Sequence, residues 1–253
     1  MPDSPATLGI VILGSLLAGF AQGVSGFAFA MIALSIWAWA LAPQVAAPLA
    51  VFGALMGQLL SLFQVRAGYD LAKIAPLVAG GVIGVPIGVF ALHNFDPINF
   101  KLAIGTLLIL YSGYGLLAGG NIRMRTGGRW LDAFMGLIGG ALGGLGGMSG
   151  SVPAIWTQVR GWSRDLRRAT MQVYNISMHV VTLTVYARTG GLAALDWRLF
   201  ALAAPAMLIP SYFGARLYRR FSERAFQRVI LSLLLFSGFA MLYGSLHSLR
   251  LIG

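Results

Sequence analysis

The sequence predicts an all-α polytopic membrane protein built from two inverted repeats, each a glycine-broken re-entrant helical hairpin plus three transmembrane helices. Three observations predict this fold: long apolar segments, two matching glycine-rich interruptions, and positive charge on one side. Of the 253 residues, 58% are hydrophobic and 10% charged, and the mean hydropathy is +0.80. Soluble domains carry about 25% charged residues, so lipid is the expected surroundings of this surface.

Apolar segments follow one another along the chain. Most are about 20 residues long, which at 1.5 Å per residue crosses a hydrocarbon core of about 30 Å. Backbone groups in lipid must bond within their own segment, so we expect helices. The segments are Leu8–Leu41, Ala46–Val65, Leu71–Leu92, Phe100–Leu117, Trp130–Val159, Ala169–Ala187, Leu199–Leu217 and Phe226–Leu246.

Two of these segments are too long for one crossing. As a single helix, Leu8–Leu41 would extend roughly 50 Å, and Trp130–Val159 is also long. Each has a glycine-rich centre, and glycine weakens a helix by about 1 kcal/mol per residue. We expect each segment to form two half-helices joined by a break.

The two breaks repeat one pattern. Gly19-x3-Gly23-x2-Gly26 matches Gly140-x3-Gly144-x2-Gly147, 121 residues later. The apolar segments after each break continue the parallel. The chain 1–253 is therefore expected to form a single transmembrane domain with one repeat at about 8–120 and the other at about 129–248.

Positive charge favours hairpins over full crossings for the broken segments. If each broken segment returns to its own side, 14 of the 18 lysines and arginines lie on one side and 4 on the other; full crossings would give 10 and 8. Cytoplasmic loops of membrane proteins are rich in Lys and Arg. Three crossings after each hairpin then invert the second repeat, and transporters of this plan bind substrate near the midplane. We expect a multi-pass protein of the bacterial inner membrane.

Several functional classes are disfavoured. The net charge is +11, but the basic residues lie in short clusters between apolar runs, which argues against nucleic-acid binding. The chain has no cysteine, its three histidines are far apart, and its acidic residues fall at expected loops or helix ends. We find no catalytic pair, metal-ligand set or phosphate-binding loop. The sequence therefore predicts no enzyme, cofactor or metal site.

The breaks also carry a family resemblance. Their repetition and the pattern Gly-x-x-Gln-Gly-x-x-Gly-Phe at Gly19–Phe27 resemble the TauE/SafE sulfite exporter family of anion permeases. The resemblance implies export of sulfite, sulfoacetate or related sulfur-containing or organic anions. Family members often have a proline after each break. Here Pro153 supplies it in the second repeat, whereas Ile32 stands at the matching position of the first.

The breaks are candidate anion sites. A helix that starts at a break presents free N–H groups and the positive end of its dipole, which suits an anion. Ser25, Ser149 and Ser151 can add hydroxyl donors or cap these helices. The alternative is that the glycines only allow close helix packing.

Polar residues follow each hairpin. Gln58 and His179 are 121 residues apart and equivalent under the repeat, and Asn175 shares the face of His179. Polar groups at this depth face the bundle interior, as substrate ligands or as interhelical hydrogen bonds. His179 is the one titratable group expected in mid-span, which makes it a candidate for proton coupling; a proton carried by the substrate, or an ion held by backbone carbonyls, is the alternative.

The candidate substrate-binding residues are Gln22, Gly23, Ser25, Gly26, Gln58, Gly144, Gly147, Ser149, Ser151, Gln172, Asn175 and His179. Arg168 either guides anions into the cytoplasmic mouth or anchors its helix at lipid headgroups. Six tryptophans near the expected span ends are interpreted mostly as interface residues.

A secondary transporter that exports a small anion is the favoured function, and an anion channel is the alternative. A channel would pass ions far faster and show no alternating states. The expected partners are the anion, the lipid bilayer and protons as a coupling ion, with homo-oligomerisation left open.

Overall fold

The computed structural model describes residues 4–62, 69–117, 124, 127–192, 197–217 and 223–252. These residues contain ten helices and no strand, so the all-α prediction is confirmed for this part of the chain. The helices are α1 (Pro5–Ser25), α2 (Phe29–Trp37), α3 (Pro43–Ser61), α4 (Leu71–Asn94), α5 (Pro97–Leu117), α6 (Gly128–Gly146), α7 (Ser151–Val159), α8 (Arg164–Arg188), α9 (Trp197–Leu217) and α10 (Glu223–Ile252). Among the cations used to predict orientation, Arg66, Arg123, Arg125, Arg219 and Arg220 lie outside the described residues.

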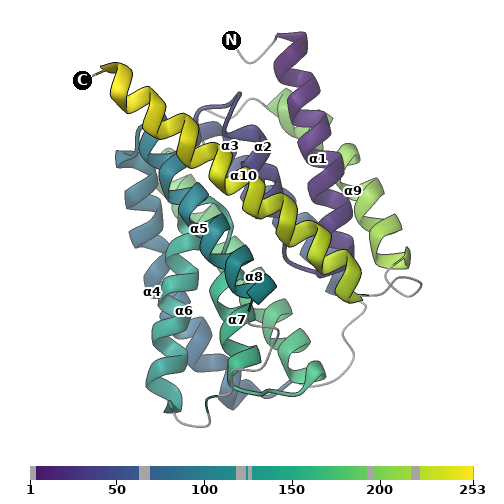
Figure 1. Ribbon diagram of the computed structural model, residues 1–253. Coiled ribbons are helices and arrows are strands. Elements are labelled where there is room, and N and C mark those ends of the chain that lie inside the picture. Colours follow the sequence, from purple (N-terminus) through teal and green to yellow (C-terminus); the bar gives the residue numbers. More distant parts are fainter. Residues whose placement is uncertain are drawn as a thin grey trace.

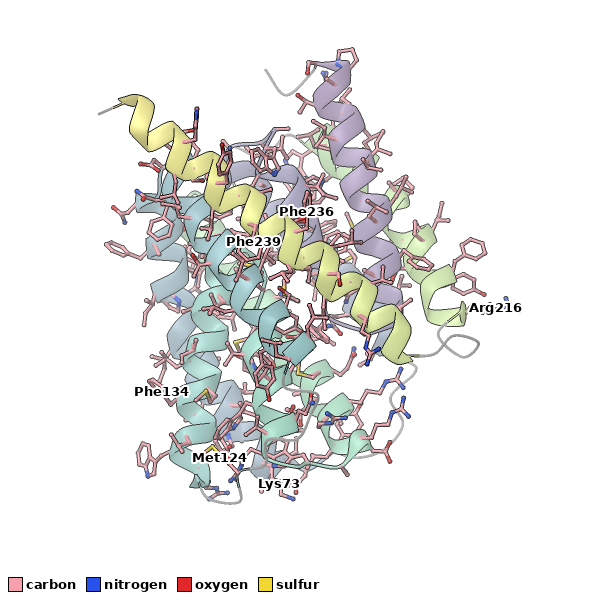
Figure 2. The ribbon with its side chains drawn as sticks, viewed as in Figure 1. Lys73, Met124, Phe134, Arg216, Phe236 and Phe239 are labelled. Atoms are coloured by element: carbon pink, nitrogen blue, oxygen red, sulfur yellow. The ribbon has the colours of Figure 1, made fainter. Side chains whose placement is uncertain are left out.

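Large apolar side chains cover the outside of the bundle. Phe134 on α6 and Phe236 and Phe239 on α10 lie on the outer surface, more than half exposed (Figure 2). Within the described residues, α1, α3, α4, α5 and α10 are long and apolar enough to cross a membrane. An apolar outer surface of this kind is suited to lipid.

Each broken segment is a long helix followed by a short one that folds back along it. Trp37 near the end of α2 donates from Nε1 to the carbonyl of Val11 on α1 at 3.2 Å. Trp156 on α7 donates from Nε1 to Oδ1 of Asp132 on α6 at 2.7 Å. The expectation of two half-helices is wrong for the first limbs, since α1 has 21 residues and α6 has 19, while α2 and α7 have nine each.

Glycine contacts explain why the first limbs stay helical. On α4, Gly80, Gly84 and Gly88 face α6, which presents its own glycines at the same four-residue spacing. A Cβ at Gly84 would lie 2.0 Å from the carbonyl oxygen of Leu137, and one at Gly140 would lie 2.1 Å from that of Gly81. The two backbones therefore touch along parallel helices, side by side in Figure 1. This packing outweighs the low helix propensity of glycine.

The two halves of the chain exchange partners. The α1 helix packs against α9, where a Cβ at Gly19 would lie 2.3 Å from the carbonyl oxygen of Met207. Thus the first helix of each half packs on the fourth helix of the other half (Figure 1). The α3 and α8 helices also pack together, as do α5 and α10. Each half therefore packs its helices against helices of the other half.

Tryptophans divide between two environments. Trp39, Trp130 and Trp197 are exposed, in line with the interface interpretation. Trp37 and Trp156 are instead buried, because their indole N–H groups tie the short helices α2 and α7 to α1 and α6.

Candidate functional site

The first break is closed by its own side chains. Gly26 ends α1 in the left-handed conformation, φ +84°, and its N–H bonds to the carbonyl of Gln22 at 2.7 Å. The hydroxyl of Ser25 accepts from the N–H of Ala28 at 3.1 Å. Oε1 of Gln22 accepts from the N–H of Phe29, the first residue of α2, at 3.1 Å. Two donors at the start of α2 are therefore satisfied inside the protein.

The second break has the same backbone turn without those caps. Gly147 adopts φ +78° and its N–H bonds to the carbonyl of Gly143 at 2.7 Å. Gly143 and Gly146 lie four residues and one residue before Gly147, the positions that Gln22 and Ser25 hold before Gly26. Neither glycine has a side chain that could accept from α7. The N–H of Ser151 bonds instead to the carbonyl of Met148 at 3.2 Å, and Pro153 has no N–H.

An amide from α8 faces the start of α7. Ser149 donates from Oγ to Oδ1 of Asn175 at 3.1 Å. A Cβ at Gly150, the N-cap of α7, would lie 2.9 Å from both amide atoms of Asn175. Asn175 is buried, and its Nδ2 has no hydrogen-bond partner. Ser151 Oγ donates to the carbonyl of Met148 at 2.8 Å. The α7 N-terminus therefore has an unused donor beside it.

Glutamine side chains connect the first break to α3 and α8. Gln58 on α3 and Gln22 both donate from Nε2 to the carbonyl of Gly26. Gln172 on α8 donates from Nε2 to the backbone carbonyl of Gln58 at 2.7 Å. Oε1 of Gln58 is buried and has no partner. A movement of the first break would therefore be transmitted through these hydrogen bonds to α8.

The face of α8 that carries Asn175 is a buried polar stripe. His179 and Thr182 follow Asn175 at helical spacing, and both are buried. Nδ1 of His179 and Oγ1 of Thr182 have no partner. Buried polar atoms are nearly always hydrogen-bonded, so the unpartnered atoms of this stripe are available to bind a ligand.

The two breaks lie close together. A Cβ at Gly147 would lie 3.1 Å from Cα of Val51 on α3 and 3.3 Å from Cβ of Ala30 in the first turn of α2. Gly144, by contrast, faces α4: a Cβ there would lie 2.2 Å from the carbonyl oxygen of Val85. Gly23 lies against Gly214 of α9. These last two glycines contact neighbouring helices, as the packing alternative describes.

Sequence reasoning missed a buried ion pair at the base of the second hairpin. Asp132 is 3% exposed and lies near the start of α6, at the kind of helix end expected for the acidic residues, but buried. Its Oδ1 is 3.4 Å from Nε of Arg160 and accepts the Trp156 N–H. Trp156 and Arg160 are one helical turn apart, but Asp132 lies 24 residues before Trp156, so only the fold brings the carboxylate to them. Arg168 is exposed near the start of α8. The described residues contain no cluster of three or more metal-ligating side chains.

Comparison with known proteins gives one match. No curated protein and no solved structure matches the chain. The family described as "Sulfite exporter TauE/SafE" matches residues 11–241, nearly the whole length. This match agrees with the resemblance of the glycine-rich breaks, and with helices apolar enough to cross a membrane. The chain belongs to the TauE/SafE family of sulfite exporters.

Proposed function

We propose that this chain is a secondary transporter that exports a small anion (sulfite, sulfoacetate or a related organosulfonate or oxyanion) across the bacterial inner membrane. The observation that carries the proposal is the start of α7. Unlike the start of α2, where Ser25 and Gln22 accept, it meets no side-chain acceptor from its own break, and it lies beside a buried Asn175 amide whose Nδ2 has no partner. An oxyanion held there would accept hydrogen bonds from both.

The chemistry of this position suits an oxyanion. A helix N-terminus carries about half a positive charge on its unsatisfied N–H groups. The hydroxyl groups of Ser149 and Ser151 are buried at the same turn and can rotate toward a ligand. Hydrogen bonds to a charged acceptor are roughly twice as strong as neutral ones. Gly147 provides the turn that brings these donors together.

The remaining candidate residues receive supporting roles. Gln22, Ser25 and Gly26 hold the first break closed, and Gln58 and Gln172 connect it to α8. Movement of one break thereby reaches the helix that carries Asn175 and His179.

We further infer that the two halves are inverted repeats and that α1–α2 and α6–α7 are re-entrant hairpins. The reciprocal pairs α1–α9 and α4–α6 support a two-fold relation between the halves. The hairpin of α6 and α7 begins and ends at the end where α8 starts, which gathers Arg129, Arg160 and Arg164 together. Such clustering fits a cytoplasmic end. Broken helices at a repeat interface recur in transporters.

Burial favours a transporter over a channel. Ser149, Ser151 and Asn175 are all nearly inaccessible to solvent. A bound anion would be enclosed, and release would require the packed helices to move. In an open pore, the hydrogen-bond donors of these three residues would be exposed to water.

Flux across the membrane of liposomes that contain the purified protein tests this function. The liposomes are loaded in turn with sulfite, sulfoacetate, sulfate, chloride or a small carboxylate, and each flux is measured with and without a pH gradient. We expect saturable flux of a sulfur oxyanion that the Ser149→Ala, Asn175→Ala double variant loses. Thr184→Ala is the matched control, because this exposed hydroxyl bonds only to its own helix. Equal, non-saturating flux of every anion would indicate a channel instead.

A further inference from the structure

We propose that the anion site selects a single negative charge, so that sulfite crosses as bisulfite and carries its proton with it. This inference rests on the proposed binding position at the start of α7. It adds the charge state of the substrate and thereby a route for proton coupling.

The first argument is the positive charge available. Among the residues whose burial the structure describes, no lysine or arginine is fully buried, and the mostly buried Arg160 already faces the buried carboxylate of Asp132. The start of α7 supplies about half a unit of positive charge. The start of α2 adds little, because Gln22 and Ser25 occupy its donors. The start of α7, whose N–H groups meet no side-chain acceptor from its own break, is therefore the main source of positive potential near Asn175.

The second argument is the position of the charged side chains. Helices α3 and α7 carry no titratable side chain. The charged groups of α4, α6 and α8 are Lys73, Arg129, Asp132, Arg164, Asp165, Arg167, Arg168 and Arg188. Apart from Asp132 and the half-buried Arg167, these are exposed. In addition, α4 carries the exposed His93, α8 carries the buried His179, and the mostly buried Arg160 follows α7. On α8, the cationic side chain nearest to Asn175 in sequence is that of Arg168. It lies seven residues earlier, about 10 Å along the helix axis.

The cost of burial then discriminates between charge states. Removing an ion from water costs several kcal/mol even after the protein relaxes. In the Born description that cost rises with the square of the charge, so a doubly charged anion costs about four times as much. The half-charge at the start of α7 and the neutral donors beside it can offset the burial cost of a single negative charge. They fall far short of offsetting the cost of two.

The third argument is a matched pair of unpartnered atoms. Asn175 Nδ2 is a donor, and Nδ1 of His179, one turn further along α8, has no partner either. A neutral imidazole protonated at Nε2 presents Nδ1 as an acceptor. Bisulfite offers oxygens to the donor and its acidic hydrogen to the acceptor. The doubly charged sulfite ion has no hydrogen to donate. Sulfoacetate carries a second negative charge on its carboxylate at neutral pH, so a site that selects a single negative charge disfavours it.

The test compares three anions in liposomes that contain the full-length protein, at equal pH on both sides. Sulfite changes from one charge to two near neutral pH, methanesulfonate keeps one charge throughout, and sulfate keeps two. Flux is measured at fixed total concentration below saturation, with the leak into protein-free liposomes subtracted. We expect sulfite flux to fall about tenfold per pH unit above its second ionisation, in step with the bisulfite fraction. Methanesulfonate flux should stay level, and sulfate should neither cross nor compete.

The outcomes are distinguishable. Sulfite flux that follows the doubly charged ion, or sulfate that competes as well as methanesulfonate, would overturn the charge rule and leave the proposed transport intact. A methanesulfonate flux that falls with pH in the same way would assign the titration to the protein rather than to the substrate and would also overturn the proposed charge selection. No flux of any anion would overturn the proposed function and the rule together.

Discussion

Ser149 and Asn175, 26 residues apart, are joined by a hydrogen bond of 3.1 Å that fastens the break between α6 and α7 to α8. The bond leaves the amide nitrogen of Asn175 unpartnered at the start of α7. A side chain in this position can hold the break in place and also contact whatever binds there. The first prediction separates these two roles.

Asn175→Ala should raise the KM for sulfite about tenfold or more, because a hydrogen bond to a charged group contributes about 1.5–3 kcal/mol. Asn175→Asp keeps the size of the side chain but adds a negative charge beside the anion, and should abolish transport. Saturation curves of flux give both values, with Thr184→Ala as the control. An unchanged KM in Asn175→Ala would remove this residue from the site.

Gly147→Ala should lose transport, while Gly190→Ala should keep it. Both glycines have positive φ, +78° and +76°, so both substitutions cost about 1–2 kcal/mol of backbone strain. Only at Gly147 does the new methyl group meet neighbours, at 3.1 Å from Val51 and 3.3 Å from Ala30; at Gly190 it enters open space. Flux and thermal unfolding, measured together, separate damage to the site from loss of stability. Equal loss of flux in both variants would count against a specific role for Gly147.

Gly140→Ala should destabilise the protein by about 1–3 kcal/mol, the usual range for overpacking. Its methyl group would lie 2.1 Å from the carbonyl oxygen of Gly81, so α4 and α6 must separate. Gly113→Ala on α5 meets nothing within 4 Å and should be neutral or stabilise the helix by up to about 1 kcal/mol. Thermal unfolding in detergent measures both. A stable Gly140→Ala variant would contradict the close backbone contact.

Asp132→Ala should lower the free energy of unfolding by about 3 kcal/mol, because it leaves the Trp156 N–H and the mostly buried Arg160 without their partner. Asp132→Asn should cost less, since its amide oxygen still accepts from Trp156. Asp165→Asn, at an exposed position in the first turn of α8, is the control and should cost only tenths of a kcal/mol. Tryptophan fluorescence during unfolding reports the change near Trp156. If Asp132→Ala unfolds like the control, the pair has no structural role.

The sequence was enough to predict the all-helical fold and the place of both interruptions. The interruptions occur at Gly26 and Gly147 because, within Leu8–Leu41 and Trp130–Val159, only these two residues have a left-handed backbone. The other glycines in α1 and α6 were misread as helix breakers. Gly19 and Gly140 stay helical because each contacts the backbone of another helix, and local propensity does not contain that information.

The candidate site shows the same limit. The polar stripe on α8 is visible in the spacing of Asn175 and His179, and the structure does bury both. The difference between the breaks was also present in the sequence, since Gly143 replaces Gln22 and Gly146 replaces Ser25. Its meaning depends on the hydrogen bonds that Gln22 and Ser25 make, which only the folded backbone defines.

The exchange of partners between the two halves has a consequence for biogenesis. During synthesis, α1 enters the membrane long before α9, the helix that covers Gly19, has been made. Until α9 is present, the glycine face of α1 has no protein partner. Because α1 and α9 belong to one chain, their pairing is intramolecular and independent of concentration.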